Sequence, residues 1–190
     1  MLNIKSYIYE FGVEPFLKSW KKRIARWQGE PVDGFVLDVC CGVGKQAWYS
    51  HLHGHRTLGV DLDPGALNFA RQRRHLSHWV RADAAFLPLK SSSVPQISIS
   101  LALHEKPVPH VEQILAEMRR VSIPDGKVIL LDFTQPWDRF SRWGWRFARI
   151  FEMSAGPAHF RLSRAFMHRG GLRGLLNSTD CTVVRSKYLT

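Results

Sequence analysis

The stretch LDVCCGVGKQA, residues 37–47, decides how this chain folds. Its apolar start predicts a buried strand, Gly42-Val43-Gly44 predicts a tight turn, and a helix is expected from Lys45 on. A strand, a glycine turn and a helix in this order open a doubly wound α/β sheet, in which ligands bind beyond the carboxyl ends of the strands. The stretch therefore predicts an α/β fold with a ligand site at the end of the first strand.

Length, composition and charge exclude several classes of protein. The chain has 190 residues and is 45% hydrophobic, which predicts a single domain over 1–190 with a sizeable core rather than a disordered chain. Two of its three cysteines, Cys40 and Cys41, are adjacent, so we expect neither a disulfide framework nor a bound metal. No apolar run has membrane-spanning length and no signal-peptide pattern is present, so we expect a cytoplasmic protein. The net charge of +11 favours an acidic partner: nucleic acid, an anionic membrane or an anionic substrate.

Strand and helix patterns alternate along the rest of the chain. Such alternation predicts a mostly parallel sheet with helices on both faces. The strands are expected at 34–40, 56–62, 78–83, 95–103, 127–133 and 181–190, and the helices at 14–27, 44–54, 64–75, 110–121 and through much of 135–176.

Two acidic residues decide between two cofactors. The glycine turn fits the relaxed dinucleotide pattern G-x-G-x-x-A, and Asp61 follows at the distance of a ribose-binding acid, so a nicotinamide enzyme is one alternative. Asp38, however, lies four residues before Gly42, where its charge would repel a pyrophosphate. S-adenosylmethionine has a positive amino group, a sulfonium and a ribose, and it suits both acids better.

Five stretches then resemble the motifs of one family in order and spacing. They are VLDVCCGVG (36–44), GVDLDPGAL (59–67), RADAAFLPL (81–89), ISISLALHE (97–105) and EMRRVSIPDGKVILLDF (117–133). Together they resemble the class I S-adenosylmethionine-dependent methyltransferases, near the branch of the ubiquinone and menaquinone C-methyltransferases. The resemblance is good over 33–134 and weak beyond. It implies a Rossmann-like sheet of strand order 3-2-1-4-5 and then 6. The family's final strand is not found before Thr190, so we expect either that the sequence is cut short there or that this strand is absent.

The resemblance also implies how the cofactor S-adenosyl-L-methionine is held. Asp61 would bind the ribose, Leu62 would pack on the adenine, and Asp83 would reach its amino group. Simpler structural roles stay open: Asp38 as a helix cap and Asp83 as a turn carboxylate, while Asp63 is expected as the N-cap of the helix at Pro64. The expected cofactor-binding residues are Asp38, Cys40, Gly42, Gly44, Asp61, Leu62, Asp83, Ala84 and Leu101.

One loop residue departs from the family pattern. Cys40 stands where the family has the first loop glycine, and a cysteine restricts the backbone more than glycine does. We expect the loop still to approach the cofactor, with weaker binding.

His104 and Glu105 are the candidate catalytic residues. They end the fourth strand, close to where the methyl group would be transferred, and either could take a proton from the acceptor. The alternative is that His104 only shapes the loop. His51, His53 and His55 straddle Gly54 and should diverge, so we expect no metal there.

The methyl acceptor is expected to lie among the variable segments, a helical cap at 1–30 and a helical acceptor-pocket segment at 135–176. The helix at 137–151 has an aromatic face beside a stripe of arginines, which suits a quinone-like or lipid-like small molecule and peripheral contact with a membrane. The alternative is a lid helix packed on the sheet. The aromatic face consists of Phe140, Trp143, Phe147, Ile150 and Phe151.

Two other functions stay open beside a small-molecule methyltransferase. An RNA-directed methyltransferase would use the basic, aromatic surface, but the Asn-Pro-Pro-Tyr type motif is absent after the fourth strand, where LHEKP stands instead. A cofactor-binding protein without catalysis is the other alternative, because methyl transfer depends mostly on positioning.

Overall fold

The computed structural model describes residue 7 and residues 9–74, 78–135, 156–179 and 183–186. The chain divides into two compact units. The first unit comprises Met1–Ser100 with Glu112–Leu130, and the second comprises Leu101–Val111 with Leu131–Thr190. The sequence predicts a single domain over 1–190, and the division into two compact units does not test that prediction.

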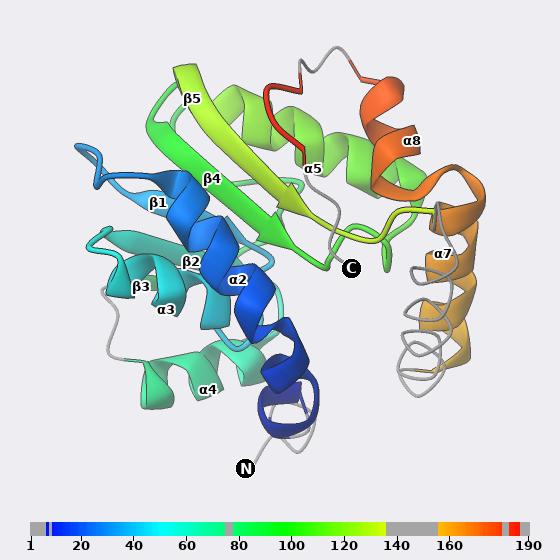
Figure 1. Ribbon diagram of the computed structural model, residues 1–190, viewed down its shortest axis with the longest axis horizontal. Coiled ribbons are helices and arrows are strands. Elements are labelled where there is room, and N and C mark those ends of the chain that lie inside the picture. The colour runs from blue at the N-terminus through cyan, green and yellow to red at the C-terminus, as the bar shows by residue number, and fades with distance from the viewer. Residues whose placement is uncertain (1–6, 8, 75–77, 136–155, 180–182, 187–190) are drawn as a thin grey trace. The chain divides into compact units, whose positions relative to one another are not determined.

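A five-stranded sheet of order β3-β2-β1-β4-β5 forms the centre of the first unit, which confirms the predicted strand order (Figure 1). β1 pairs in parallel with β2 and β4, and β2 pairs in parallel with β3. In this register Asp38 lies opposite Gly59 on one side and Ser98 on the other. The strands are β1 (Val36–Val39), β2 (Thr57–Asp61), β3 (His78–Arg81), β4 (Val94–Ser100) and β5 (Ser122–Leu131).

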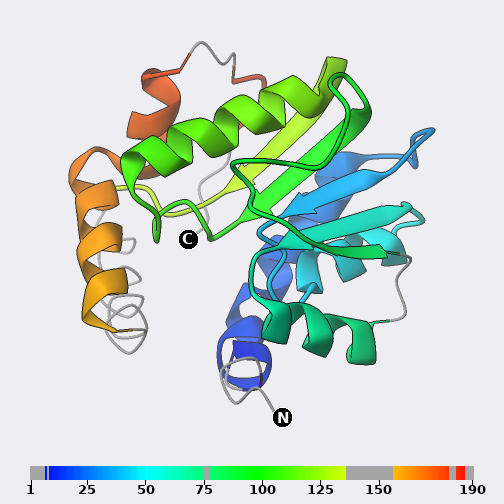
Figure 2. The same cartoon turned by 180° about the vertical axis from the view of Figure 1, so that it is seen from behind.

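Helices cover both faces of this sheet, as predicted. α2 and α3 lie on the face toward the viewer in Figure 1, and α5 from Glu112 on lies on the opposite face, which Figure 2 brings to the front. All four residues of β1 are buried, as expected for a central strand covered on both sides. The helices are η1 (Tyr9–Val13, a π-helix), α2 (Glu14–Gln28), α3 (Lys45–Leu52), α4 (Pro64–Arg73) and α5 (Val108–Val121).

The apolar pattern of 14–27 predicts an inward face of Phe16, Leu17, Trp20, Ile24 and Trp27, with Lys18, Lys21, Lys22 and Arg26 off it, and the observed inward face of α2 differs from this. Leu17 and Ile24 are buried as expected, whereas Phe16 is 70% exposed. Lys21, expected on the outer face, is buried because its ammonium pairs with the carboxylate of Glu14, two turns earlier. A buried lysine needs such a partner, so α2 turns this ion pair inward.

β5 begins five residues earlier than predicted. Residues Pro124-Asp125-Gly126 are of the turn-forming type and predict a turn, but they lie inside the strand, where Asp125 has a φ of +60°. Aspartate tolerates this left-handed conformation better than most residues, so the strand continues through it.

The described part of the second unit contains two helices, α7 (Pro157–His168) and α8 (Gly171–Asn177). Thr134, just after β5, forms an antiparallel bridge with Gly171. The predicted helix at 137–151 and its aromatic face lie outside the described residues. Of the strand predicted at 181–190, residues 183–186 are described and have no regular secondary structure, so the prediction is wrong for that stretch. Among the helices of the described residues, none is long and apolar enough to cross a membrane.

Candidate active site

The loop after β1 turns through three residues of left-handed backbone. Cys40 and Gly42 both have a φ of +53°, and Gly44, the N-cap of α3, has a φ of +75°. The N–H of Gly44 donates to the carbonyl of Cys41 (2.8 Å), which closes the turn. A Cβ atom at Gly42 would meet nothing within 4 Å, so the backbone there is open to a ligand, whereas a Cβ atom at Gly44 would overlap the Trp79 ring.

Asp38 is buried at the end of β1 and joins three elements. One carboxylate oxygen accepts the backbone N–H of Ala47 in α3 (3.0 Å), and the other accepts the hydroxyl of Ser98 in β4 (3.2 Å). Burial raises the pKa of Asp38 to about 7, although Lys21 and these hydrogen bonds oppose the rise. Asp38 therefore caps α3, as the simpler structural role predicted, and it is also an acid whose charge a cationic ligand would stabilise.

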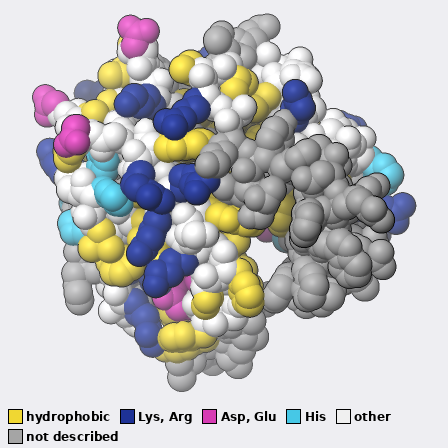
Figure 3. Space-filling view, in the orientation of Figure 1, with side chains coloured by type: hydrophobic (Ala, Val, Ile, Leu, Met, Phe, Trp, Pro, Cys, Tyr) yellow, Lys and Arg dark blue, Asp and Glu magenta, His cyan; other side chains and the backbone are white. Residues whose placement is uncertain are grey.

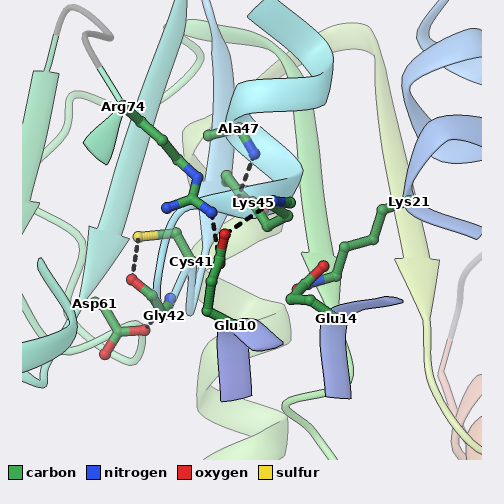
Figure 4. A network of polar contacts seen from close by, with 10 residues as sticks. Glu10, Glu14, Lys21, Cys41, Gly42, Lys45, Ala47, Asp61 and Arg74 are labelled. Atoms are coloured by element: carbon green, nitrogen blue, oxygen red, sulfur yellow. Dashed lines mark hydrogen bonds and ion pairs between the residues drawn. The ribbon is translucent and has the colours of Figure 1, made fainter. Parts of the chain in front are cut away.

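Asp61 ends β2 and holds the glycine loop in place (Figure 4). One of its oxygens accepts the N–H of Gly42 (2.7 Å), and the other accepts the N–H of Asp63 (2.9 Å). Each carboxylate oxygen has a second lone pair, so both can still accept from a ribose hydroxyl. Asp63 accepts the N–H of Gly65 (2.7 Å) at the start of α4, which confirms it as the N-cap.

The residues expected at the adenine lie after β2 and β3. Leu62 is 57% exposed, so its apolar side chain is available to a flat ring. Asp83 accepts the N–H of Ala85 (2.9 Å), as a carboxylate that stabilises a turn does. The next residue, Ala84, is buried. An adenine-binding role for Asp83 stays a prediction.

In the second unit, His104 is held by a carboxylate that the sequence patterns did not single out. His104 Nδ1 and Asp132 Oδ1 lie 2.7 Å apart, and both side chains are buried. Asp132 also accepts the backbone N–H of Leu103 (2.8 Å) and that of His104 (3.3 Å). When Nδ1–H donates to Asp132, the neutral imidazole has its lone pair on Nε2, which is the arrangement of a general base.

A second histidine lies beside this pair. The ring of His159, from α7, meets the ring of His104 edge-on at 5.5 Å between centroids. His159 Nδ1 lies 3.5 Å from the carboxylate of Glu105, which also contacts Lys106 Nζ at 3.3 Å. Both predicted catalytic residues thus belong to one cluster of titratable groups. Leu101, which was expected to contact the cofactor, precedes this cluster in the sequence. It has a φ of +55°, and its N–H donates to the carbonyl of Leu131 (2.7 Å).

Asp132 and His159 were not predicted as site residues, and only Asp132 has a sequence signal that could have identified it. Asp132 ends the apolar run KVILLDF, and an acid at the end of a buried parallel strand is a candidate site residue because strand ends meet at one edge of the sheet. His159 has no comparable signal, since nothing in its helix pattern distinguishes it. The three histidines at 51–55 form no metal group: among the described residues no three acidic, histidine or cysteine side chains are placed to share a metal ion.

Comparison with known proteins gives the same interpretation of this loop and sheet. Residues 37–130 match a family model described as a methyltransferase domain. The chain is 31% identical over 134 residues to the 2-phytyl-1,4-naphtoquinone methyltransferase of Thermosynechococcus vestitus, covering 65% of this chain and 59% of that protein. It is 30% identical over 139 residues to the demethylmenaquinone methyltransferase of Lactobacillus johnsonii, covering 66% and 54%. The solved structure of YcgJ from Bacillus subtilis superposes with a TM-score of 0.59 at 21% identity, covering 72% of this chain and 60% of that one.

The chain belongs to the class I S-adenosylmethionine-dependent methyltransferases. It spans a little more than half the length of the curated relatives it matches. Its own residues fit this family's cofactor, because open space at Gly42 adjoins two acids, Asp38 and Asp61, which suit a cationic ligand with a ribose and would repel a pyrophosphate. Membership in a methyltransferase family therefore argues against the nicotinamide alternative.

The left-handed conformation of Cys40 predicts that glycine would be more stable there. A residue with a Cβ atom loses about 1–2 kcal/mol in this region, and glycine costs about 0.5–1 kcal/mol of extra chain entropy. Cys40→Gly should therefore raise the free energy of unfolding by up to about 1.5 kcal/mol in urea denaturation. Cys41→Gly is the matched control: Cys41 is buried and has no positive φ, so its replacement should lower stability. Equal effects of the two changes would contradict this account of the loop.

Asp38 predicts a pH dependence of cofactor binding. Its pKa of about 7 means that the carboxyl is increasingly protonated below that pH, whereas the cationic end of the cofactor requires the ionised form. The dissociation constant for S-adenosylhomocysteine, measured by calorimetry, should rise below pH 7 by up to about tenfold per pH unit and stay constant above about pH 8. Asp38→Asn should bind more weakly and without this dependence. A wild-type affinity that does not change between mildly acidic and mildly alkaline pH would reject the role of Asp38.

Proposed function

We propose that the protein transfers a methyl group from S-adenosylmethionine to a small hydrophobic or amphipathic acceptor of the quinol type. The observation that supports this most is the match over residues 37–130, together with relatives named as naphthoquinone and menaquinone methyltransferases. When bound, the cofactor supplies an electrophilic methyl group on its sulfonium.

The buried pair of His104 and Asp132 supplies the proton chemistry that a quinol acceptor requires. A ring carbon becomes nucleophilic when the neighbouring hydroxyl loses its proton, and His104 Nε2 is the proposed acceptor of that proton. Once the carbon is methylated, it loses its own hydrogen as a proton and the oxygen regains one, which restores the aromatic quinol. Asp132 holds the imidazole by Nδ1 and stabilises the imidazolium that forms. Glu105, linked to His159, offers a second group to relay the proton onward.

The proposed chemistry predicts that replacing the base slows turnover without weakening cofactor binding. His104→Ala should lower kcat by about 10²–10⁴-fold, the usual contribution of a general base. Asp132→Asn should lower kcat less, because the neutral amide still occupies the position but no longer stabilises a charged imidazolium. Calorimetry with S-adenosylhomocysteine should give wild-type affinity in both variants. Full turnover in His104→Ala would contradict the role of His104 as a general base. The protein would then act only by positioning the acceptor against the cofactor.

The acceptor class is tested by transfer of a labelled methyl group from the cofactor. Reduced naphthoquinols in detergent micelles should be labelled, whereas phospholipids and structured RNA should not. Labelling of RNA alone would replace this proposal with the RNA-directed alternative, which the net charge of +11 supports. Binding of S-adenosylhomocysteine with no labelled acceptor in any class would favour a cofactor-binding protein without catalysis.

Peripheral membrane contact is part of the same proposal, and the described residues support it through α2. Lys18, Lys22 and Arg26 are exposed on this helix, and Figure 3 shows lysine and arginine side chains gathered along it. Two aromatic rings, Phe11 and Phe16, are 63% and 70% exposed in the same segment. Basic side chains beside exposed aromatics suit an anionic lipid surface, where a quinol would be found.

Charge reversal on α2 should therefore weaken binding to anionic vesicles. Each basic residue near such a surface contributes about 1 kcal/mol, so Lys18→Glu with Lys22→Glu should lower binding by at least about tenfold in co-sedimentation. Lys90→Glu with Arg119→Glu is the matched control, since both residues are exposed and lie on other elements. Equal loss in both pairs would indicate a general effect of net charge, and negligible wild-type binding would reject membrane contact.

A further inference from the structure

The carboxylate of Glu10 lies between two cations beside the glycine loop (Figure 4). One oxygen accepts from Lys45 Nζ (2.9 Å), and the other accepts from Arg74 Nη2 (2.6 Å). The Glu10 side chain is 10% exposed and the Arg74 side chain 4%. Burial would raise the pKa of Glu10, but Lys45 and Arg74 outweigh it and hold the pKa below its ordinary value. The Glu10 side chain is thus a mostly enclosed, ionised carboxylate with two charged partners, although no residue of η1 is buried as a whole.

The cluster of Glu10, Lys45 and Arg74 has more positive charge than the Glu10 carboxylate neutralises, and more hydrogen-bond donors than it accepts from. Two cations face one anion, and Arg74 Nε and Nη1 are buried with no hydrogen-bond partner among the described residues. Leaving a buried donor unpaired costs about 1–3 kcal/mol, and more when the group is charged. Arg74 therefore has the unused donors of a guanidinium that could bind a second acceptor.

Lys45 places the cluster next to the cofactor loop. It is the first residue of α3 and follows Gly44, which gives the helix no side-chain cap. The dipole of α3 adds positive potential for an anion at this end, although the N–H of Ala47 is already bound to Asp38. A phosphate dianion would be repelled by Asp38 and Asp61, which belong to the same loop region, whereas a single carboxylate beside a cationic amino group would not.

We propose that Lys45 and Arg74 bind the carboxylate at the methionine end of the cofactor, and that Glu10 occupies this position when no cofactor is bound. The proposal rests on the proposed function, because it requires S-adenosylmethionine as the ligand. Guanidinium and carboxylate groups pair in a two-pronged geometry, which gives Arg74 a use for its remaining donors. Glu10 itself is the same chemical group as the proposed ligand.

The segment that contains Glu10 is suited to give way. η1 is a π-helix of five residues with no buried residue, and Phe11 within it is 63% exposed. π-helical turns often occur at functional sites, and a segment with few buried apolar contacts opens at low cost. Cofactor binding would then exchange one carboxylate for another and release Glu10 of η1 from Lys45 and Arg74.

Calorimetry with two ligands tests this proposal. S-adenosylhomocysteine has the carboxylate, and 5′-methylthioadenosine lacks the whole amino-acid end. Glu10→Gln should bind S-adenosylhomocysteine several-fold more tightly, because the competing carboxylate is gone, while its melting temperature falls because Lys45 and the buried Arg74 lose their anionic partner. Arg74→Met should bind it about 10–100-fold more weakly, the contribution of hydrogen bonds to a charged group. Binding of 5′-methylthioadenosine should be the same in all variants.

Two further variants keep the test decisive. Arg74→Lys retains the charge and protects the fold, and it should still weaken S-adenosylhomocysteine binding because it lacks the two-pronged geometry. Glu117→Gln is the matched control, since it removes a different ion pair, with Arg120, and should lower stability alone. Weaker binding in Glu10→Gln, or wild-type binding in both Arg74 variants, would overturn the proposal. Failure of the wild-type protein to bind either ligand would instead reject the proposed function.

Discussion

The structure of the first unit depends on one buried carboxylate. Asp38 accepts hydrogen bonds from α3 and from β4 while its own backbone belongs to β1, so it fixes the first turn of the helix against two central strands. Burial makes its charge costly, which is why its pKa rises to about 7. A group that is needed for the fold and is nevertheless poised to lose its proton near neutral pH is suited to receive a cation. The same atoms thus serve the architecture and the proposed cofactor.

The conformation of the glycine loop depends on contacts from β2 and β3 as well as on its own residues. Asp61 in β2 accepts the N–H of Gly42, and the Trp79 ring of β3 fills the space that side chains at Gly44 and Gly59 would need. Small residues therefore stand where neighbouring groups approach most closely. At Gly42 the opposite holds, because the space beside it is open. One loop glycine thus serves packing, and another leaves room for a ligand.

Features that depend on local pattern could be predicted from the sequence. Alternating strands and helices indicated the parallel sheet, the family motifs indicated its order, and Asp63 before Pro64 indicated an N-cap, each because neighbouring residues determine it. The partners of Glu10 and His104 were not predicted, because they depend on packing between segments: Glu10 lies 35 residues from Lys45 and 64 from Arg74. The early start of β5 was missed for another reason, since a turn-forming sequence can be accommodated within a strand by one left-handed aspartate.

Charged groups in the two units are supported in different ways, and this difference bears on mechanism. In the first unit the acids Asp38 and Asp61 bind backbone N–H groups of the cofactor loop and its helix, so their charge is tied to loop position. In the second unit Asp132 binds the backbone N–H of Leu103 and the side chain of His104 together. The imidazole is therefore oriented by a carboxylate that is itself fixed to the backbone just after β4. Such fixation is consistent with the proposed proton transfer, because a carboxylate at Nδ1 would stabilise a positive charge on the ring of His104.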